Sequence, residues 1–207
     1  MLAGCVLASG CYRGTARTAT PADLADPRDG WNQVDGVPPV RQIGREDCGA
    51  AALAMVLGYW GLPITREAIA AGTGNPAAAE PGIRAAALRD FARRQGLQAF
   101  LVQGDLADLD REVGRHRPVL VGVMKRYGRR IYPHYEVVVG VSRGTKRVLT
   151  LDPAHGQRVN SREGFMGEWT AAGRLTLIVF RSQPLSHPLG LAPRLRAAHL
   201  SREEPSK

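Results

Sequence analysis

The stretch DCGAAALAMVLGYWG, from Asp47 to Gly61, is the clearest structural signal in the chain. It is rich in Ala, Leu and Met, which favour a helix, and Asp47 stands where an N-cap belongs. Gly61 stands where a helix ends, because glycine readily adopts the left-handed conformation of a C-terminal cap. Apolar residues occur on nearly every face, so we predict a buried central helix around which the rest of the chain packs.

Beyond this helix the periodicity changes from helical to alternating. Two further helices are predicted over residues 65–71 and 82–95. The elements predicted after them are mostly strands, and they cover residues 97–103 (strand), 105–117 (helix), 118–125, 134–142 and 147–154 (strands), 161–171 (helix) and 174–181 (strand). The strands at 134–142 and 147–154 are joined by the turn RGTK, which predicts an antiparallel hairpin. Helices followed by an antiparallel sheet predict an α+β fold.

Length and charge narrow the class of protein. At 207 residues the chain has room for one domain with a hydrophobic core. Its formal net charge is +9, carried almost entirely by arginine, and a basic surface attracts acidic partners. The arginines form no stripe interleaved with aromatic residues, so we do not expect nucleic-acid binding. No run of about 18 apolar residues occurs, so no membrane-spanning helix is predicted.

The cysteines exclude two common uses of this residue. Cys5 and Cys11 lie in the first dozen residues, whereas Cys48 stands alone in the body of the chain, so the pattern is not a disulfide framework. No second sulfur lies at a ligand spacing from Cys48, so the pattern does not indicate a zinc site. We predict no metal and no organic cofactor.

Cys48 occupies the first turn of the predicted central helix, where unpaired backbone N–H groups and the helix dipole favour an anion. Because cysteine attacks a carbonyl carbon as the thiolate, this position suits a nucleophile. Gly49 leaves room beside it for a substrate backbone. Gln42 lies in the extended segment before the helix, from which its amide N–H could point at the resulting oxyanion. The alternative is that Cys48 is a small buried hydrophobic residue.

A base for this thiol must come from elsewhere in the chain, and His134 has the most suitable position among the five histidines. It opens a strand whose hairpin partner contains Asp152, so we predict that the two side chains meet. A carboxylate there would hold the imidazole in the tautomer needed to act on the thiol. His155, in the loop after the second strand, is a rival base. Asp152 before Pro153 also has a simpler interpretation, as a turn residue.

The chain resembles the bacteriocin-processing family of papain-like cysteine peptidases, which remove leader peptides after a double glycine, over roughly residues 36–181. The resemblance rests on Q-x5-C with DCGAAALAMVLGYWG, on HYEVVVGV and on LDPAHG. It implies a papain-like fold and a peptide or protein substrate. The roles that it implies are nucleophile for Cys48, general base for His134, orienting acid for Asp152 and oxyanion donor for Gln42.

Two features depart from the family pattern. Members often form the N-terminal domain of an export transporter, whereas these 207 residues contain no membrane domain and no phosphate-binding loop. Ala50 stands where members often have proline. Cleavage after Gly-Gly is therefore expected by analogy alone.

The first residues, MLAGCVLASGC, resemble a bacterial lipobox at LAGC, which ends in Cys5, and more loosely at ASGC, which ends in Cys11. The cysteine of such a signal carries a lipid after cleavage, which predicts a chain anchored in the bacterial cell envelope, on its periplasmic or outer-surface side. The apolar stretch is shorter than a complete export signal, so we expect the natural start to lie upstream. The alternative is a disordered apolar start.

Together these patterns predict three segments. Residues 1–30, rich in Ala, Thr, Pro and Asp from residue 12 onward, are predicted to be a lipoprotein signal remnant and a flexible tether. Residues 31–182 are predicted to be the peptidase domain, entered through an extended segment that ends at residue 46. Residues 183–207 are predicted to be a loosely ordered tail.

Two other functions are compatible with the same residues. A catalytically silent module with this fold would use the cleft to hold a peptide at the cell surface. An amidase or transferase would form the same acyl-enzyme and pass the acyl group to an amine, which the sequence does not distinguish from hydrolysis.

Overall fold

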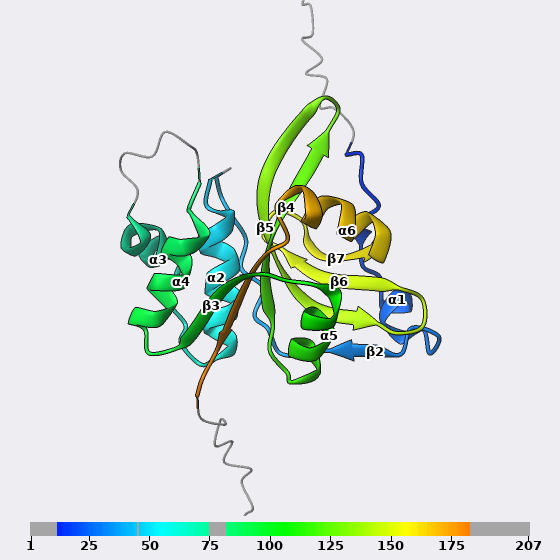
Figure 1. Cartoon of the computed structure of the whole chain (residues 1–207), viewed down its shortest axis with the longest axis horizontal. Helices are drawn as coiled ribbons and strands as arrows, with labels where there is room; N and C mark the ends of the chain where they lie inside the picture. Colours follow the sequence, from blue (N-terminus) through cyan, green and yellow to red (C-terminus); the bar gives the residue numbers. More distant parts are fainter. Residues whose placement is uncertain (1–11, 45, 75–81, 183–207) are drawn as a thin grey trace, which may run out of the picture.

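The computed structural model describes residues 12–44, 46–74 and 82–182 (Figure 1). Its strands form one sheet in the order β1-β7-β6-β5-β4-β8-β3, and β2 pairs with β5 off this path. All of these pairings are antiparallel. The strands are β1 (Arg17–Thr18), β2 (Trp31–Gln33), β3 (Gln98–Gln103), β4 (Val119–Tyr127), β5 (Arg130–Ser142), β6 (Arg147–Asp152), β7 (Gly156–Ser161) and β8 (Leu175–Phe180).

Helices cover both faces of this sheet. One face packs against α2 and α4, and α3 packs on these two helices, so that all three lie together on one side in Figure 1. The other face packs against α5 and α6. The helices are α1 (Pro21–Ala25), α2 (Cys48–Tyr59), α3 (Arg66–Thr73), α4 (Ala85–Arg94), α5 (Leu106–Gly114) and α6 (Arg162–Ala171). This arrangement agrees with the predicted α+β class.

The central strands are buried on both faces, which explains their unbroken apolar sequence. In β5, Val137 and Val139 belong to the core beneath α2, whereas Val138 belongs to the core beneath α5 and α6. Successive side chains of a strand point to opposite faces, so a run of valines fills both cores at once. The sheet is therefore the central layer of the molecule.

Helix α2 is the buried helix that the sequence predicts. Every residue from Cys48 to Leu57 is buried, and Gly61, with φ of +75°, follows its C-terminus. Asp47 does not cap the helix through its side chain. Its carboxylate instead accepts hydrogen bonds from the backbone N–H groups of Ile43 and Gly44, at 3.0 and 3.1 Å. Asp47 therefore fixes the loop that precedes the helix.

The predicted hairpin between residues 134–142 and 147–154 is present as β5 and β6. Val137 pairs with Leu151, and the register shifts at a bulge between Val138 and Gly140. The strand β5 begins four residues earlier than predicted, because Gly128, with φ of +59°, turns the chain directly from β4 into β5. The polar sequence GQRVNS also forms a strand, β7, which the periodicity did not indicate.

The segment 12–30 differs from the predicted flexible tether, because it packs against the sheet. Helix α1 begins with a complete capping box between Thr20 and Asp23. Arg147 on β6 forms ion pairs with Asp23 and with Asp29, which is fully buried. Composition alone suggested a tether, but both carboxylates are held by one cation, Arg147, that comes from elsewhere in the chain. The remaining predictions for residues 1–11 and 183–207 fall outside the described residues.

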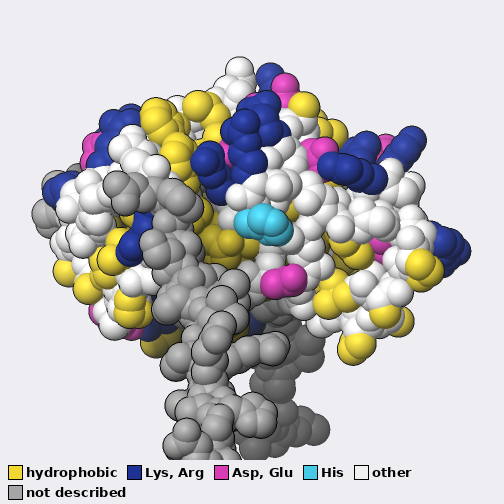
Figure 2. Space-filling model, turned by 90° about the horizontal axis from the view of Figure 1, so that it is seen from below, with side chains coloured by type: hydrophobic (Ala, Val, Ile, Leu, Met, Phe, Trp, Pro, Cys, Tyr) yellow, Lys and Arg dark blue, Asp and Glu magenta, His cyan; other side chains and the backbone are white. Residues whose placement is uncertain are grey.

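The surface carries its charge in separate groups. On the face shown in Figure 2, Lys and Arg side chains gather in several places with hydrophobic and uncharged surface between them. One such group lies at the end of α5, where Arg111, Arg115 and Arg117 surround the buried carboxylate of Glu112. Among the described residues, no helix has the length and apolar character to cross a bilayer.

Candidate active site

A cavity of about 1370 Å³ contains all four residues singled out in the sequence. Its walls come from the loop before α2, the start of α2, the segment before α4, the outer part of β4 and β5, and the turn after β6. Gln42, Cys48, His134 and Asp152 all line it. Residues far apart in the chain therefore meet at one opening, as the hairpin argument predicted for His134 and Asp152.

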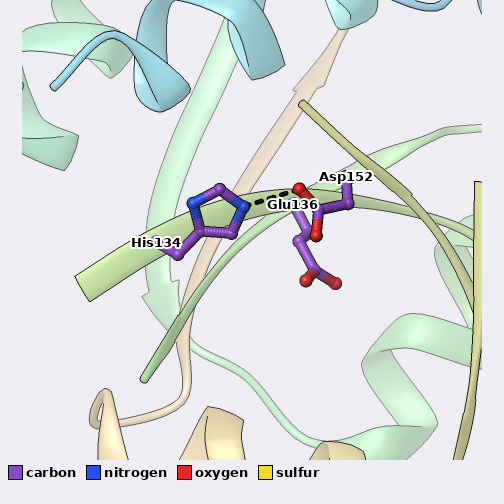
Figure 3. A group of neighbouring side chains, drawn as sticks. All are labelled: His134, Glu136 and Asp152. Carbon is purple, nitrogen blue, oxygen red and sulfur yellow. Dashed lines mark hydrogen bonds and ion pairs between the residues drawn. The ribbon is translucent and has the colours of Figure 1, made fainter. Parts of the chain in front are cut away.

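His134 and Asp152 are joined directly. The imidazole Nε2 donates a hydrogen bond to Asp152 Oδ1 at 2.8 Å (Figure 3). Asp152 is 2% exposed and stands one position past Leu151, which pairs with Val137 across the two strands. Since Nε2 is engaged by the carboxylate, Nδ1 is the ring nitrogen left to interact with a thiol.

The carboxylate of Asp152 is held by several donors. Oδ1 also accepts from the backbone N–H of Ala154 at 2.7 Å, and Oδ2 accepts from His155 Nδ1 at 2.9 Å. Burial alone would raise the pKa of Asp152, but the hydrogen bonds from His134 and His155 outweigh burial and hold this pKa well below its usual range. Asp152 is therefore ionised and rigidly placed. His155, which the sequence suggested as a rival base, binds the far side of the same carboxylate.

Cys48 lies buried at the first turn of α2 and lines the same cavity as His134. Burial disfavours the charged imidazolium, yet the hydrogen bonds of His134 with Asp152 and Cys48 outweigh burial and raise its pKa. The imidazole is thus placed between a thiol and a carboxylate. This order of thiol, imidazole and carboxylate is the arrangement of a nucleophile, a base and a group that orients the base.

The loop with Gln42 is tied to the same site. Its backbone N–H donates to the carbonyl of Pro153, directly after Asp152, at 3.0 Å. Its side-chain Nε2 donates to the carbonyl of Gly44 at 2.8 Å. Gln42 is therefore fixed by the turn that carries Asp152 and by its own loop, with its amide at the wall of the cavity.

Gly49 has a different use from the one predicted. A Cβ atom at this position would lie 3.1 Å from the ring of Tyr135 and 3.2 Å from Leu88. The space beside Gly49 is thus filled by protein side chains rather than left for a substrate. Tyr135 also donates a hydrogen bond to the carbonyl of Ile83, and so links β5 to the segment before α4.

A second carboxylate, Glu136, lies beside the His134–Asp152 pair. Ligand atoms of these three residues lie within 4.8 Å of one another, and Figure 3 shows the Glu136 carboxylate directed away from the contact between the other two. Lys125 binds Glu136 at 2.6 Å and Glu168 at 2.7 Å. Because each group already has a partner of opposite charge or a hydrogen bond, the chemistry of this group fits an ionic network better than a metal centre.

Several residues of the cavity wall were not singled out in the sequence. Some lie before α4, where the predicted helix over residues 82–95 begins only at Ala85 in the structure, and the others lie at the turn between β4 and β5. The members of this wall are Gly82, Ile83, Arg84, Tyr127, Arg129, Arg130 and Tyr132. Gly82 and Gly128 mark turns in the sequence, but a glycine does not indicate where a turn lies in space.

Comparisons with known proteins point to one family. The model of the Peptidase C39 family matches residues 36–183. The chain is 28% identical over 153 residues to the lactococcin-A transport/processing ATP-binding protein LcnC of Lactococcus lactis subsp. lactis. That alignment covers 71% of this chain but only 19% of the relative, so the chain spans about a fifth of the length of that protein.

Solved structures show the same fold. The peptidase domain of Streptococcus ComA, a bifunctional ABC transporter involved in a quorum sensing pathway, has 25% identity and a TM-score of 0.57, covering 70% of this chain and 99% of that domain. A putative C39-like peptidase from Bacillus anthracis has 18% identity and a TM-score of 0.59, covering 73% and 98%. A double glycine motif protease from an AMS/PCAT transporter, solved with its leader peptide, has 24% identity and a TM-score of 0.55, covering 71% and 92%.

These findings confirm the resemblance noted in the sequence and the papain-like fold. The family match covers most of the chain and includes Gln42, Cys48, His134 and Asp152, which line the cavity. We conclude that the chain belongs to the peptidase C39 family and is a cysteine peptidase.

Proposed function

We propose that the protein hydrolyses peptide bonds after a Gly-Gly pair through a triad of Cys48, His134 and Asp152. The observation that carries this proposal is the 2.8 Å hydrogen bond from His134 to Asp152 within the cavity that Cys48 lines. The raised pKa of His134 supports it, because the imidazolium stays populated at neutral pH next to the thiol. A cation at that place favours the thiolate, the form that attacks carbonyl groups.

The reaction follows from this geometry. The Cys48 thiolate attacks the scissile carbonyl carbon, and the carbonyl oxygen becomes an oxyanion. The C–N bond then breaks while the imidazolium of His134 donates its proton to the leaving amine, which leaves a thioester on Cys48. Neutral His134 next takes a proton from water, which attacks the thioester, and the carboxylic acid product and the thiolate are released. Asp152 keeps the ring oriented throughout and stabilises its positive charge.

We assign the stabilisation of the oxyanion to Gln42 and to the start of α2. One N–H of the Gln42 side chain is held by the carbonyl of Gly44, which leaves the second N–H for the substrate. The first backbone N–H groups of α2 have no acceptor within the helix, so they can bind a negative charge. Donors that are fixed before the reaction stabilise the transition state without reorganisation.

The preference for Gly-Gly is supported by the relatives. The protease solved with a leader peptide is a double glycine motif protease, and the lactococcin-A relative is a transport and processing protein. Two peptides that differ only in Gly-Gly or Ala-Ala before the scissile bond test the preference. We expect kcat/KM for the Gly-Gly peptide to exceed that for the Ala-Ala peptide by at least tenfold. Equal values would refute the preference for Gly-Gly but not the peptidase activity.

Alkylation tests the nucleophile directly. Iodoacetamide should label Cys48 at pH 6 much faster than an ordinary thiol, because the neighbouring imidazolium favours the thiolate. In protein produced without acylation, Cys5 and Cys11 of the same chain serve as reference thiols when labelled peptides are counted by mass spectrometry. In His134→Ala the rate at Cys48 should fall towards that of the reference thiols.

Activity completes this test. Cys48→Ala should abolish cleavage of the Gly-Gly peptide while the melting temperature stays close to that of the wild type. Slow labelling of Cys48 together with full activity of Cys48→Ala would exclude the proposed nucleophile. Mass spectrometry of products formed with an added amine distinguishes hydrolysis from transfer of the acyl group.

We also propose that the protein is anchored in the bacterial cell envelope through a lipid on Cys5 or Cys11. The support is the lipobox-like sequence before each cysteine. Radiolabelled fatty acid should be incorporated by the wild type in cells, and Cys5→Ser and Cys11→Ser together should abolish it. Each single variant then identifies the modified residue, and unchanged labelling of the double variant would contradict the proposal.

A further inference from the structure

Strands β4 and β5 extend beyond the rest of the sheet as a two-stranded ribbon, residues 122–136. The pairing of β4 with β8 stops at Val121, and the pairing of β5 with β6 begins at Val137. Between these points the two strands pair with each other along their whole length. Figure 1 shows this β4–β5 ribbon projecting from the body of the molecule.

The outer part of the ribbon is strongly basic. Arg126, Arg129 and Arg130 are exposed there, and Arg13 is exposed beside them, with its backbone N–H bonded to the carbonyl of Arg126 at 2.9 Å. Within the described chain, none of these four arginines forms an ion pair with a carboxylate. The sequence contains no Asp or Glu from residue 113 to residue 135. By contrast, the arginines at the end of α5 surround Glu112.

Apolar and aromatic side chains accompany these charges. Ile131 is 53% exposed at the outer end of β5. Tyr127 packs against Tyr12 and Tyr132, with ring centroids 5.5 and 6.1 Å apart. Arginine, tyrosine and an exposed aliphatic residue together are typical of surfaces that sit at the boundary between lipid headgroups and acyl chains.

The N-terminal end of the described chain lies at the same place. Tyr12 forms a β-bridge with Tyr127, and this segment runs beside the ribbon in Figure 1. Cys11, one of the two candidates for a lipid anchor, is the residue before Tyr12. A lipid at that residue would hold the ribbon against the membrane surface, because Tyr12 is bridged directly to Tyr127 of the ribbon.

We propose that the outer part of the β4–β5 ribbon, with Arg13, is a docking surface for an anionic lipid membrane. The four arginines bind lipid phosphates through charge and hydrogen bonds, and Ile131 enters the interfacial layer. Each basic residue near an anionic surface strengthens binding about fivefold at physiological ionic strength. The contact therefore adds to the lipid that a lipobox cysteine would carry, and it fixes which face of the domain meets the membrane.

A membrane fits this surface better than an acidic peptide in the cavity. The exposed Ile131 and the nearby N-terminal segment have no evident use in binding an anionic peptide, but both serve at a bilayer. Tyr127, Arg129, Arg130 and Tyr132 also line the cavity that contains Cys48. On the proposed peptidase function, docking would thus place the mouth of the active site at the membrane surface, where it meets peptides that emerge from or lie on the bilayer.

Co-sedimentation with vesicles tests the surface without the anchor or the chemistry. The protein is the full chain with Cys5→Ser, Cys11→Ser and Cys48→Ala, so neither acylation nor catalysis contributes. We expect it to bind vesicles of phosphatidylcholine that contain phosphatidylglycerol, to bind pure phosphatidylcholine weakly, and to dissociate as the salt concentration rises. Adding Arg129→Gln and Arg130→Gln should weaken binding by about 25-fold, at about fivefold for each arginine.

The opposite end of β5 supplies a matched control. Arg143 and Lys146 are exposed in the turn between β5 and β6, at the end of β5 away from the ribbon. The double variant Arg143→Gln with Lys146→Gln therefore removes two positive charges, as the ribbon variant does, but at a distant place. This control should bind like its parent. Ile131→Ser should weaken binding several-fold without any change in net charge, and circular dichroism checks that each variant is folded.

Three results would overturn the proposal. The first is no preference of the parent chain for anionic vesicles. The second is an equal loss of binding in the ribbon variant and in the control, which would mean that only total charge matters. The third is unchanged vesicle binding of Arg129→Gln with Arg130→Gln together with a raised KM for acidic peptides in the chain that retains Cys48, which would assign these arginines to the substrate.

Discussion

Strand β6 carries a buried ionic cluster at each end, and the two clusters serve different purposes. At its start, Arg147 binds Asp23 at 2.7 Å and also pairs with Asp29, which is fully buried. At its end, Asp152 binds His134 at 2.8 Å and is 2% exposed. Burial and pairing are therefore alike at the two ends, and neither property identifies the active site.

The difference lies in the cation and in access. A guanidinium keeps its proton at any pH that a protein experiences, so the Arg147 cluster can only hold the N-terminal segment against the sheet. An imidazole can give up and take back its proton during a reaction, and His134 opens onto a cavity together with Cys48. The same ionic design is structural at one end of the strand and suited to chemistry at the other.

The largest effect is expected when the Asp152 end loses its charge. Asp152→Asn should lower kcat on the Gly-Gly peptide by about 10⁴-fold, because an amide neither stabilises the imidazolium nor keeps the ring in the required tautomer. Asp29→Asn is the matched control at the other end of β6, and its kcat should equal that of the wild type at a temperature where it is folded. A similar loss in both variants would show that the two ends are not functionally distinct.

The Arg147 end should respond in stability. Arg147→Met removes the cation from the buried carboxylate of Asp29, and leaving such a charge unpaired costs about 3 kcal/mol. Urea unfolding followed by circular dichroism measures this loss, and kcat should be unchanged under native conditions. The contrast between the ends of β6 would be lost if the variant unfolded like the wild type or if its kcat fell.

The sequence predicted the Asp152 end far better than the Arg147 end. A hairpin places residues of its two strands opposite each other, so His134 and Asp152 could be brought together from spacing alone. The buried helix α2 was equally clear, because its apolar composition is continuous from Gly49 to Leu57. Both inferences depend on local periodicity, which a single sequence displays.

The Arg147 end depends on partners that no local pattern reveals. Asp23 and Asp29 lie in a stretch whose composition is typical of a flexible linker, and only the folded chain brings Arg147 to them. The β4–β5 ribbon was underestimated for a related reason, because RYGRRIYP lacks the alternation that marks a half-buried strand. Exposed ribbons need no apolar alternation, so periodicity does not find them.

A smaller effect is expected from the loop that the Asp152 turn holds in place. Gln42→Ala should lower kcat about 100-fold with little change in KM, because an oxyanion donor acts mainly in the transition state. Gln33→Ala, on strand β2, is a control of the same chemistry away from the cavity. A rise in KM with constant kcat would instead make Gln42 a residue that binds the substrate in its ground state.

The smallest predicted effect concerns His155 and gives the comparison a pH dependence. His155→Ala removes one donor from Asp152 Oδ2 and should lower kcat about fivefold, the effect of a single hydrogen bond. The control His116→Ala, at the end of α5, should leave kcat unchanged. Burial raises the pKa of Asp152, whereas the hydrogen bonds from His134 and His155 lower it. Removing the His155 side chain should therefore raise the pKa of Asp152.

The sign of the pH effect follows from this shift. The ionised Asp152 contributes stability above its unfolded pKa of about 3.9, and this contribution is lost as the pH falls through the lower folded pKa. Loss of His155 brings the folded pKa closer to the unfolded one, so the variant is less stable than the wild type near neutral pH and the difference shrinks as the pH falls below about 4. The acid limb of kcat/KM should move to higher pH for the same reason. If the pH profiles of the variant and the wild type were superimposable, solvent rather than His155 would satisfy Oδ2 of Asp152. His155 would then have no role in the site, and His134 would be the only histidine that acts with Asp152.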